Sequence, residues 1–190
     1  MNRPDQQLIR ESLAGQTSAF GELVLRYQDR LHQALCQMLR SPDDAQDVAQ
    51  DAFVLAFEKL ASYRGDASFY SWLFRIAANS AVSFLRKQKR GTTMPSSAGD
   101  GRTDPIDTNI ESMPTYGVER KENQQRVQDA LDALSDEFRT ALVLKEMEGL
   151  KYEEIASIVS CPIGTVRSRI HRARAELRDR LRDVVRDSPP

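Results

Sequence analysis

The sequence predicts an all-α protein made of two small helical domains that are joined by a flexible linker, with a helix-turn-helix in the C-terminal domain. Apolar residues recur at three- and four-residue spacing over most of the chain, which is typical of amphipathic helices. No segment alternates apolar and polar residues convincingly, as strands do. One central segment, residues 91–117, has no helical stripe and is rich in Gly, Pro, Ser and Thr.

Composition bounds the class of protein. The 190 residues are 40% hydrophobic and 29% charged, which is typical of a soluble globular protein. Neither a signal peptide nor an apolar run near the ~20 residues of a membrane span is present, so we expect a cytoplasmic protein without membrane insertion. The two cysteines have no CxxC neighbour, which predicts neither a metal site nor a disulfide framework. No cofactor or catalytic site is expected, and the protein is predicted not to be an enzyme.

Residues 1–90 are expected to form the N-terminal helical domain. A helical period from Phe20 to Leu39 predicts one long amphipathic helix. Ser41 can cap the next helix, and Pro42 fits its first position. A further helix is predicted from about Phe69 to Lys89. The middle helix has a broad face that we expect to be buried, formed by Ala45, Val48, Ala49, Ala52, Phe53, Ala56, Phe57 and Leu60.

The segment 91–117 is predicted to be a linker, which as a flexible coil would average about 28 Å and extend to about 85 Å. Residues 118–190 then form the C-terminal domain. Ser135 is expected to cap its second helix, and Gly149 to end that helix. The apolar positions expected in this core are Val127, Ala130, Leu131, Leu134, Phe138, Ala141, Leu142 and Leu144.

Residues 149–174 have the pattern of a helix-turn-helix, whose second helix can lie in the DNA major groove. In the first helix an apolar face is predicted, with Ala156 small enough for a close crossing. In the second helix Pro162 is expected at the first position. Ile163, Val166 and Ile170 are predicted to face the first helix. The residues left toward solvent are Thr165, Arg167, Ser168, Arg169, His171, Arg172 and Arg174.

Charge supports a nucleic-acid role for this second helix. It holds five arginines between Ile163 and Arg178 and one acid, Glu176. The alternative is a solvated amphipathic helix that closes a bundle. Over the whole chain Lys+Arg number 27 and Asp+Glu 28, so only the local distribution of charge is informative.

A second candidate surface lies at residues 63–90, where aromatic residues precede a basic end. Trp72 and Ile76 are expected to be core residues. Exposed aromatic rings beside basic and amide side chains would suit single-stranded DNA, because each stacked base contributes roughly 1–3 kcal/mol. Asn79 is a candidate for holding a flipped base by its polar edge. The neighbouring polar candidates are Arg75, Arg86 and Lys87.

Three segments in order resemble the extracytoplasmic-function (ECF) group of bacterial sigma-70 RNA polymerase sigma factors. They are DAQDVAQDAFVLAFEKL, YRGDASFYSWLFRIAANSA and GLKYEEIASIVSCPIGTVRSRIHRARAEL. The resemblance spans nearly the whole chain outside residues 91–117. It implies an alternative sigma factor that binds core RNA polymerase and directs promoter-specific initiation, with the clamp helices and the flap of the polymerase, promoter DNA and an anti-sigma factor as partners.

The resemblance also implies residue roles. Residues expected to dock on the polymerase clamp helices are Asp47, Gln50, Asp51 and Phe53. Residues expected to capture the melted minus-ten strand are Arg64, Ser68, Arg75, Asn79, Arg86 and Lys87. Residues expected to read the minus-thirty-five duplex are Thr165, Arg167, Ser168, His171, Arg172 and Arg174.

Four positions differ from the usual family pattern. Ser160 stands where glycine is common in the turn, at a cost of roughly 1–2 kcal/mol if the backbone there is left-handed. Lys151 replaces a frequent Ser or Thr cap. His171 and Ser83 bear on base preference.

Two other classes of protein remain as alternatives. A non-sigma helix-turn-helix regulator would use the N-terminal domain to dimerise or sense a ligand. A metal-dependent nuclease would use Asp43, Asp47 and Asp51, whose spacing could in principle hold a divalent cation. A complex with core polymerase distinguishes the sigma factor from the regulator.

Overall fold

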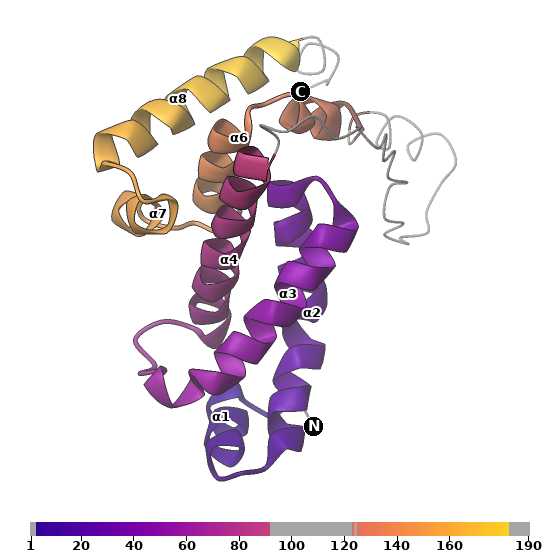
Figure 1. The fold of residues 1–190 in the computed structure, drawn as a ribbon, viewed down its shortest axis with the longest axis vertical. Helices are drawn as coiled ribbons and strands as arrows, with labels where there is room; N and C mark the ends of the chain where they lie inside the picture. Colours follow the sequence, from indigo (N-terminus) through magenta and orange to yellow (C-terminus); the bar gives the residue numbers. More distant parts are fainter. Residues whose placement is uncertain (1–2, 92–122, 124, 183–190) are drawn as a thin grey trace, which may run out of the picture. The chain divides into compact units, whose positions relative to one another are not determined.

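The computed structural model describes residues 3–91, 123 and 125–182. The chain divides into two compact units, Met1–Ala98 and Gly99–Pro190. Every regular element in the described residues is helical, so the prediction of an all-α fold with two helical domains is confirmed (Figure 1). Beyond Gly91 the predicted linker 91–117 lies outside the described residues.

The described residues of the first unit, 3–91, form four α-helices and one short 3-10 turn. They are α1 (Asp5–Leu13), α2 (Thr17–Leu39), α3 (Pro42–Glu58), η1 (Leu60–Ser62) and α4 (Phe69–Gly91). The helices α2, α3 and α4 pack against one another, and α1 packs on α2 (Figure 1). The predicted helix boundaries agree with α2 and α4 within a few residues.

Local chemistry explains the joint between α2 and α3. Arg40 ends α2 in the left-handed conformation, with φ 64°, and its N–H donates to the carbonyl of Cys36. Ser41 then caps α3, because its hydroxyl accepts from the N–H of Asp44 at 3.2 Å. Pro42 is the first residue of α3, as expected, since its missing N–H costs nothing there.

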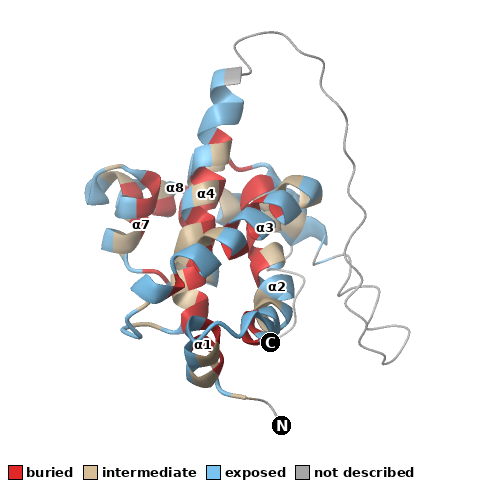
Figure 2. Cartoon of the chain, turned by 60° about the horizontal axis from the view of Figure 1, so that its bottom comes forward, coloured by how far each residue is buried: buried red, intermediate tan, exposed pale blue. Residues whose placement is uncertain are grey.

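The buried face of α3 differs from the prediction at one residue. Ala45, Ala52 and the other predicted apolar positions are buried, but Phe57 is 42% exposed. The ring of Phe57 contacts Phe20 at its edge, with centroids 5.0 Å apart. Figure 2 shows that the buried residues of this unit line the inner sides of the helices. Phe57 lies at the edge of the buried face, whose centre is formed by Ala52 and Ala56, and periodicity alone does not decide on which side of that edge a residue falls.

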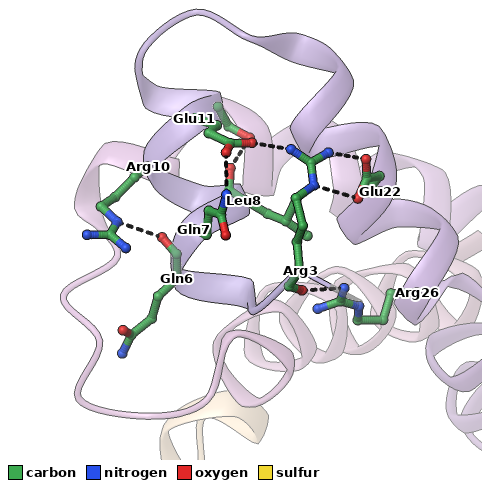
Figure 3. Close-up of polar contacts among 9 residues, drawn as sticks. Arg3, Gln6, Gln7, Leu8, Arg10, Glu11, Glu22 and Arg26 are labelled. Atoms are coloured by element: carbon green, nitrogen blue, oxygen red, sulfur yellow. Dashed lines mark hydrogen bonds and ion pairs between the residues drawn. The ribbon is translucent and has the colours of Figure 1, made fainter. Parts of the chain in front are cut away.

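A polar network fixes α1 on α2 (Figure 3). Arg3 pairs with Glu11 on α1 and with Glu22 on α2. Asp5 accepts hydrogen bonds from Arg26 and from the Tyr27 hydroxyl. These contacts orient Tyr27, whose ring lies 5.8 Å from Phe69 and 5.6 Å from Tyr70, centroid to centroid. The first helix is thereby connected to the start of α4.

The second unit holds the helical residues 125–132, then α6 (Asp136–Leu142), η2 (Val143–Met147), α7 (Tyr152–Val159) and α8 (Ile163–Arg180). Both α6 and α7 contact α8. Leu134, Leu142 and Ala173 form the centre of a core cluster in this unit. Val127 differs from the prediction, because it is 39% exposed.

The predicted signals at both ends of the α6–η2 helix are confirmed. Ser135 caps α6 by accepting from the N–H of Phe138. The η2 segment is a π-helical turn, in which the N–H of Glu148 donates to the carbonyl of Val143 at 3.2 Å. Gly149 follows with φ 67°, a conformation that suits glycine. No local pattern of residues predicts the π turn.

A buried arginine closes the joint before α6. The Arg139 side chain is 1% exposed, and its Nη1 lies 3.2 Å from Asp132 Oδ1. Its Nη2 lies 3.7 Å from Asp136 Oδ1. A buried charge is tolerated when it is paired, so this ion pair fixes the angle between residues 125–132 and α6.

Candidate nucleic-acid and protein interfaces

The acidic face of α3, defined here by Asp47, Gln50 and Asp51, is exposed to solvent. Phe53, the fourth residue of this predicted surface, is instead 8% exposed and belongs to the core. It lies on the same side of α3 as Ala49 and Ala52, which the helical period explains. Val54, which is 59% exposed, occupies the outward position beside the three polar residues.

Sequence reasoning missed Val54, although a signal for it existed. Counting from Asp47, the positions three, four and seven residues later are Gln50, Asp51 and Val54, which share one side of a helix. The apolar group of this face is therefore a valine, and not the phenylalanine that the motif suggested. An acidic rim with an exposed aliphatic centre is suited to binding a basic protein surface.

The aromatic–basic stripe of α4, defined by Trp72, Arg75, Asn79 and Arg86, runs along the side opposite to the core. Trp72 and Ile76 are half-buried, so the prediction that they are core residues is wrong. The core positions are their neighbours, with Phe69 at 1% and Phe74 at 1% exposure. The spacing of Trp72, Arg75 and Asn79 places them on one face, a signal the aromatic content obscured.

The Trp72 ring contacts two other aromatic rings, one in α4 and one in the segment before it. Its centroid lies 5.8 Å from that of Phe69 and 5.4 Å from that of Tyr63. The Tyr63 hydroxyl donates to the carbonyl of Ala67 at 2.6 Å, which fixes the loop 64–68. Burial raises the pKa of Tyr63. Two partly exposed rings are thus held beside the polar stripe.

The polar residues of this region that are candidates for DNA binding differ in their exposure and in the hydrogen bonds that they make within the protein. Asn79 is exposed, and its amide donates to the carbonyl of Arg75 at 2.7 Å. Ser68 caps α4 by accepting from the N–H of Ser71 at 3.1 Å, so its hydroxyl has a structural role. Arg64, Arg86 and Lys87 are exposed. Lys87 lies one position off the stripe, whereas Arg86 continues it.

In the helix-turn-helix, the turn and the start of α8 differ slightly from expectation. Pro162 precedes the helix as its N-cap, with ψ 147°, and not as its first residue. Its carbonyl accepts from Thr165 and Val166, so proline remains compatible with the helix start. Ile163 is 38% exposed, and the core contacts come from Val166 and Ile170.

The turn between α7 and α8 contains a left-handed residue, which is the condition under which the sequence predicts strain at Ser160. Ser160 has φ 50° and ψ 53°, so a serine occupies a position that favours glycine. The N–H of Cys161 donates to the carbonyl of Ala156, which completes the helix end. Ala156 is half-buried. At the other end of α7, Lys151 is the N-cap, and Glu154 accepts from its backbone N–H at 2.8 Å.

The exposed residues of α8 agree in position with the prediction, since Arg167, Ser168, His171 and Arg172 are all exposed. Thr165 is half-buried. The Ser168 hydroxyl donates to the carbonyl of Thr165 at 2.9 Å. Arg172 is exposed and lies away from the core side, which is formed by Val166, Ile170 and Ala173.

Two arginines of α8 are held by acids of the same unit. Arg174 donates to Glu146 Oε1 through Nη2 at 2.5 Å and through Nε at 3.1 Å. This hydrogen bond raises the pKa of Arg174. Arg169 Nη2 lies 2.5 Å from Glu137 Oε2, and its Nη1 lies 3.8 Å from Cys161 Sγ. Both residues flank the core side of the helix, so they are less available to DNA than Arg172.

No three His, Cys, Asp or Glu side chains in the described residues come together in a way that could hold a metal ion. This includes Asp43, Asp47 and Asp51, which the nuclease alternative requires. Cys36 and Cys161 are both free thiols, and burial raises the pKa of Cys36. Within 3–91 and 125–182, none of the helices has the length and apolar character needed to span a bilayer.

The fold and these surfaces define the class of protein as a helical DNA-binding protein with a helix-turn-helix. Family models agree with both units. The model of Sigma-70 region 2 matches residues 23–91, and that of Sigma-70, region 4 matches residues 124–177.

Individual relatives match almost the whole chain. The RNA polymerase sigma-H factor of Pseudomonas aeruginosa is 40% identical, over 97% of this chain and 97% of the relative. The ECF RNA polymerase sigma-E factor of Escherichia coli K12 is 39% identical, over 96% of each. Among solved structures, the sigma factor RpoE in complex with the anti-sigma factor NepR from Bartonella quintana is 28% identical. That match has a TM-score of 0.65 and covers 86% of this chain and 96% of that chain.

The chain belongs to the ECF group of the sigma-70 family and is an alternative sigma factor that directs transcription. The match over both units excludes the alternative of a helix-turn-helix regulator from another family. The relatives are sigma factors and not enzymes.

Proposed function

We propose that this sigma factor binds core RNA polymerase through α3, captures the melted minus-ten strand along α4 and reads the minus-thirty-five duplex with α8. The observation that carries the proposal is the separation of three exposed surfaces on three helices. The acidic face, the aromatic–basic stripe and the basic side of α8 each present a different chemistry. Each chemistry fits one class of partner.

The acidic face of α3 would dock on the clamp helices of the polymerase large subunit. Asp47 and Asp51 supply charge, Gln50 supplies hydrogen bonds, and Val54 supplies the apolar contact. We assign no direct docking contact to Phe53, since it is buried. Its contribution would be to hold the face in shape.

The stripe of α4 would hold bases that have already left the duplex. Opening roughly ten base pairs costs on the order of 14 kcal/mol at about 1.4 kcal/mol per stacking step. Stacking on Trp72 and Tyr63 supplies roughly 1–3 kcal/mol per base, which is too little to open the duplex alone. The protein would therefore capture bases that open inside the polymerase complex. Arg64, Arg75, Arg86 and Lys87 would contact phosphates, and Asn79 a base edge.

The exposed residues of α8 would read the minus-thirty-five element in the major groove. Arg167, Ser168, His171 and Arg172 are the proposed contacts, with Thr165 at the helix start. Phosphate contacts give affinity that depends on salt, whereas base-edge contacts give sequence preference. Arg174 would contribute only where DNA displaces its Glu146 partner.

A groove beside α8 suits the second expected polymerase contact, the flap. Its volume is about 400 Å³, and its lining is mainly apolar. Met147 is 52% exposed at this groove. An apolar segment of the flap would fill it, so Met147→Asp should weaken the effect of the minus-thirty-five element without altering clamp binding. The apolar lining residues are Leu131, Leu142, Val143, Met147 and Leu177.

We further propose a cytoplasmic protein that an anti-sigma factor restrains. The support is the similar chain of the sigma factor RpoE, which was solved in complex with the anti-sigma factor NepR. Such an anti-sigma protein would act by covering exposed faces that the polymerase or DNA needs.

The test is transcription in vitro with the full chain and purified core polymerase from Pseudomonas aeruginosa or Escherichia coli. Promoters are first located by mapping transcription start sites after overexpression of the chain. We expect specific initiation from those promoters and none from core polymerase alone. Absence of promoter-specific transcripts, despite a stable complex with core polymerase, would contradict the proposal.

A further inference from the structure

One aromatic ring of the second unit contacts a predicted DNA-binding arginine. Tyr152 is the first residue of α7 and is half-buried. The Cζ atom of Arg167 lies over its ring, 5.6 Å from the ring centroid. The Nζ atom of Lys145 lies 4.9 Å from the same centroid. Both distances are within the range in which the face of an aromatic ring attracts a cation.

The kind of contact distinguishes Arg167 from two other arginines of α8. A carboxylate that pairs with a guanidinium occupies its N–H donors, as Glu146 does with Arg174. An aromatic face attracts the guanidinium through its π-system and leaves the N–H donors available. In the described parts of the chain, Arg167 has no carboxylate partner. It is therefore restrained and still able to bind bidentately.

A second cation, Lys145, also contacts the Tyr152 ring. Lys145 belongs to the π-helical turn η2, and its ammonium donates to the carbonyl of Leu150 at 3.2 Å. Tyr152 thus contacts both a cation of η2 and a cation of α8. An arginine side chain has many rotamers, and restraint before binding reduces the entropy lost when it contacts a base.

We propose that Tyr152 is a positioning residue, whose ring orients Arg167 toward one base pair of the minus-thirty-five element and thereby sets the preference at that pair. Arg167 is the fifth residue of α8, near the end of a recognition helix that meets base edges. The inference rests on the proposed function, in which Arg167 contacts DNA. It adds a residue that does not touch DNA to the determinants of promoter choice.

The experiment uses holoenzyme assembled from the full chain and core polymerase, with a promoter library in which the minus-thirty-five element is randomised. The variants are Tyr152→Leu, Tyr152→Met, Tyr152→Phe, Arg167→Ala and the double variant Tyr152→Leu with Arg167→Ala. Arg167→Ala should relax the preference at one base pair. Tyr152→Leu and Tyr152→Met should relax the same pair and lower binding to the preferred element about two- to fivefold. Tyr152→Phe keeps the ring and should behave as the wild type.

The double variant separates positioning from a general effect on folding. If Tyr152 acts through Arg167, removing the ring has no additional effect once Arg167 is alanine. An equal loss in both backgrounds, relaxation at a different base pair, or failure of Tyr152→Phe would overturn the inference. If Arg167→Ala leaves promoter binding unchanged, the proposed DNA contact of Arg167 fails as well, whereas promoter-specific transcription would still support the wider function.

Discussion

Single residues decide which side chains of α3 reach a partner. Phe53 and Val54 are adjacent in sequence, but Phe53 is 8% exposed and Val54 is 59% exposed. Of two neighbouring motif residues, one therefore contributes to the stability of the fold and the next is available for binding. This division can be measured, because the two functions have different readouts.

We expect Phe53→Ala to lower the free energy of unfolding by about 3–5 kcal/mol, since it leaves a cavity in the core. Val54→Ala should change that free energy by less than about 0.5 kcal/mol. In a binding assay with core polymerase, Val54→Ala should nevertheless raise the dissociation constant. Urea denaturation and titration with labelled core polymerase give the two quantities. Equal stability of both variants would place Phe53 outside the core.

The serine in the helix-turn-helix turn is a second residue-scale feature. Ser160 adopts φ 50°, which costs a non-glycine residue roughly 1–2 kcal/mol. Ser160→Gly should therefore raise the free energy of unfolding, by about 1 kcal/mol or less, because glycine also gains entropy in the unfolded chain. Ser157→Gly, within regular α7, is the matched control and should be destabilising. If Ser160→Gly lowered the free energy of unfolding, the inferred backbone strain at Ser160 would be contradicted.

At the scale of elements, α1 is coupled to the aromatic start of α4 through Tyr27. Burial, and then the hydrogen bond to Asp5, raise the pKa of Tyr27 to about 12 from its usual 10.0. A raised pKa means that the folded state holds the proton more tightly than the unfolded state. The stabilisation is complete below pH 10 and is lost as the pH rises toward 12.

Tyr27→Phe should remove this pH-dependent part. We expect the wild type to lose more stability between pH 9 and 11.5 than Tyr27→Phe, although the variant is slightly less stable at pH 8 because it lacks one hydrogen bond. Urea midpoints at each pH test the difference, since the other tyrosines and lysines titrate in both proteins. Parallel pH profiles would show that Tyr27 is not the responsible group.

The ion pair between α8 and η2 gives another prediction at this scale. Glu146 engages Arg174 at 2.5 Å and competes with phosphate for the same donors. In Glu146→Gln the guanidinium is released, so binding of the holoenzyme to promoter duplex should tighten and its dependence on salt should steepen by up to about 0.9 in log–log slope. Glu153→Gln, an exposed change on α7, is the control for lost negative charge. Unchanged salt dependence would argue that Arg174 stays away from DNA.

The helices also show how much of the fold can be predicted from the sequence. Periodicity and cap residues identified α2, α3 and α4, because Ser41 and Pro42 signal a helix start locally. Residues at the edge of an apolar stripe, such as Phe57 and Ile163, are harder to predict, because periodicity does not decide on which side of the edge they fall. The π turn of η2 and the contact of Tyr152 with Arg167 depend on tertiary packing, so no local pattern indicated them. Which residues of α8 face solvent can be predicted from the sequence. The ion pairs of Arg169 with Glu137 and of Arg174 with Glu146 cannot.

For the whole molecule, the proposed division of labour predicts separable defects. Charge reversal at Asp47 and Asp51 should weaken binding to core polymerase and spare the recognition of duplex by α8. Arg172→Ala should spare core binding and lower the salt slope of minus-thirty-five recognition by at most about 0.9, the share of one phosphate contact. Holoenzyme assembly and promoter binding are measured separately for each variant. A variant that impaired both steps equally would argue against independent surfaces.

The π-helical turn Val143–Met147 sets the direction of the side chains around it. A regular helix advances about 100° per residue, so one extra residue in a wide turn rotates all that follows by that angle. Deleting a single residue from this segment would restore an ordinary helix and turn the side chains that now meet Tyr152 and Arg174 to another direction. The phase of this one turn thereby selects which side chains contact Tyr152 and Arg174.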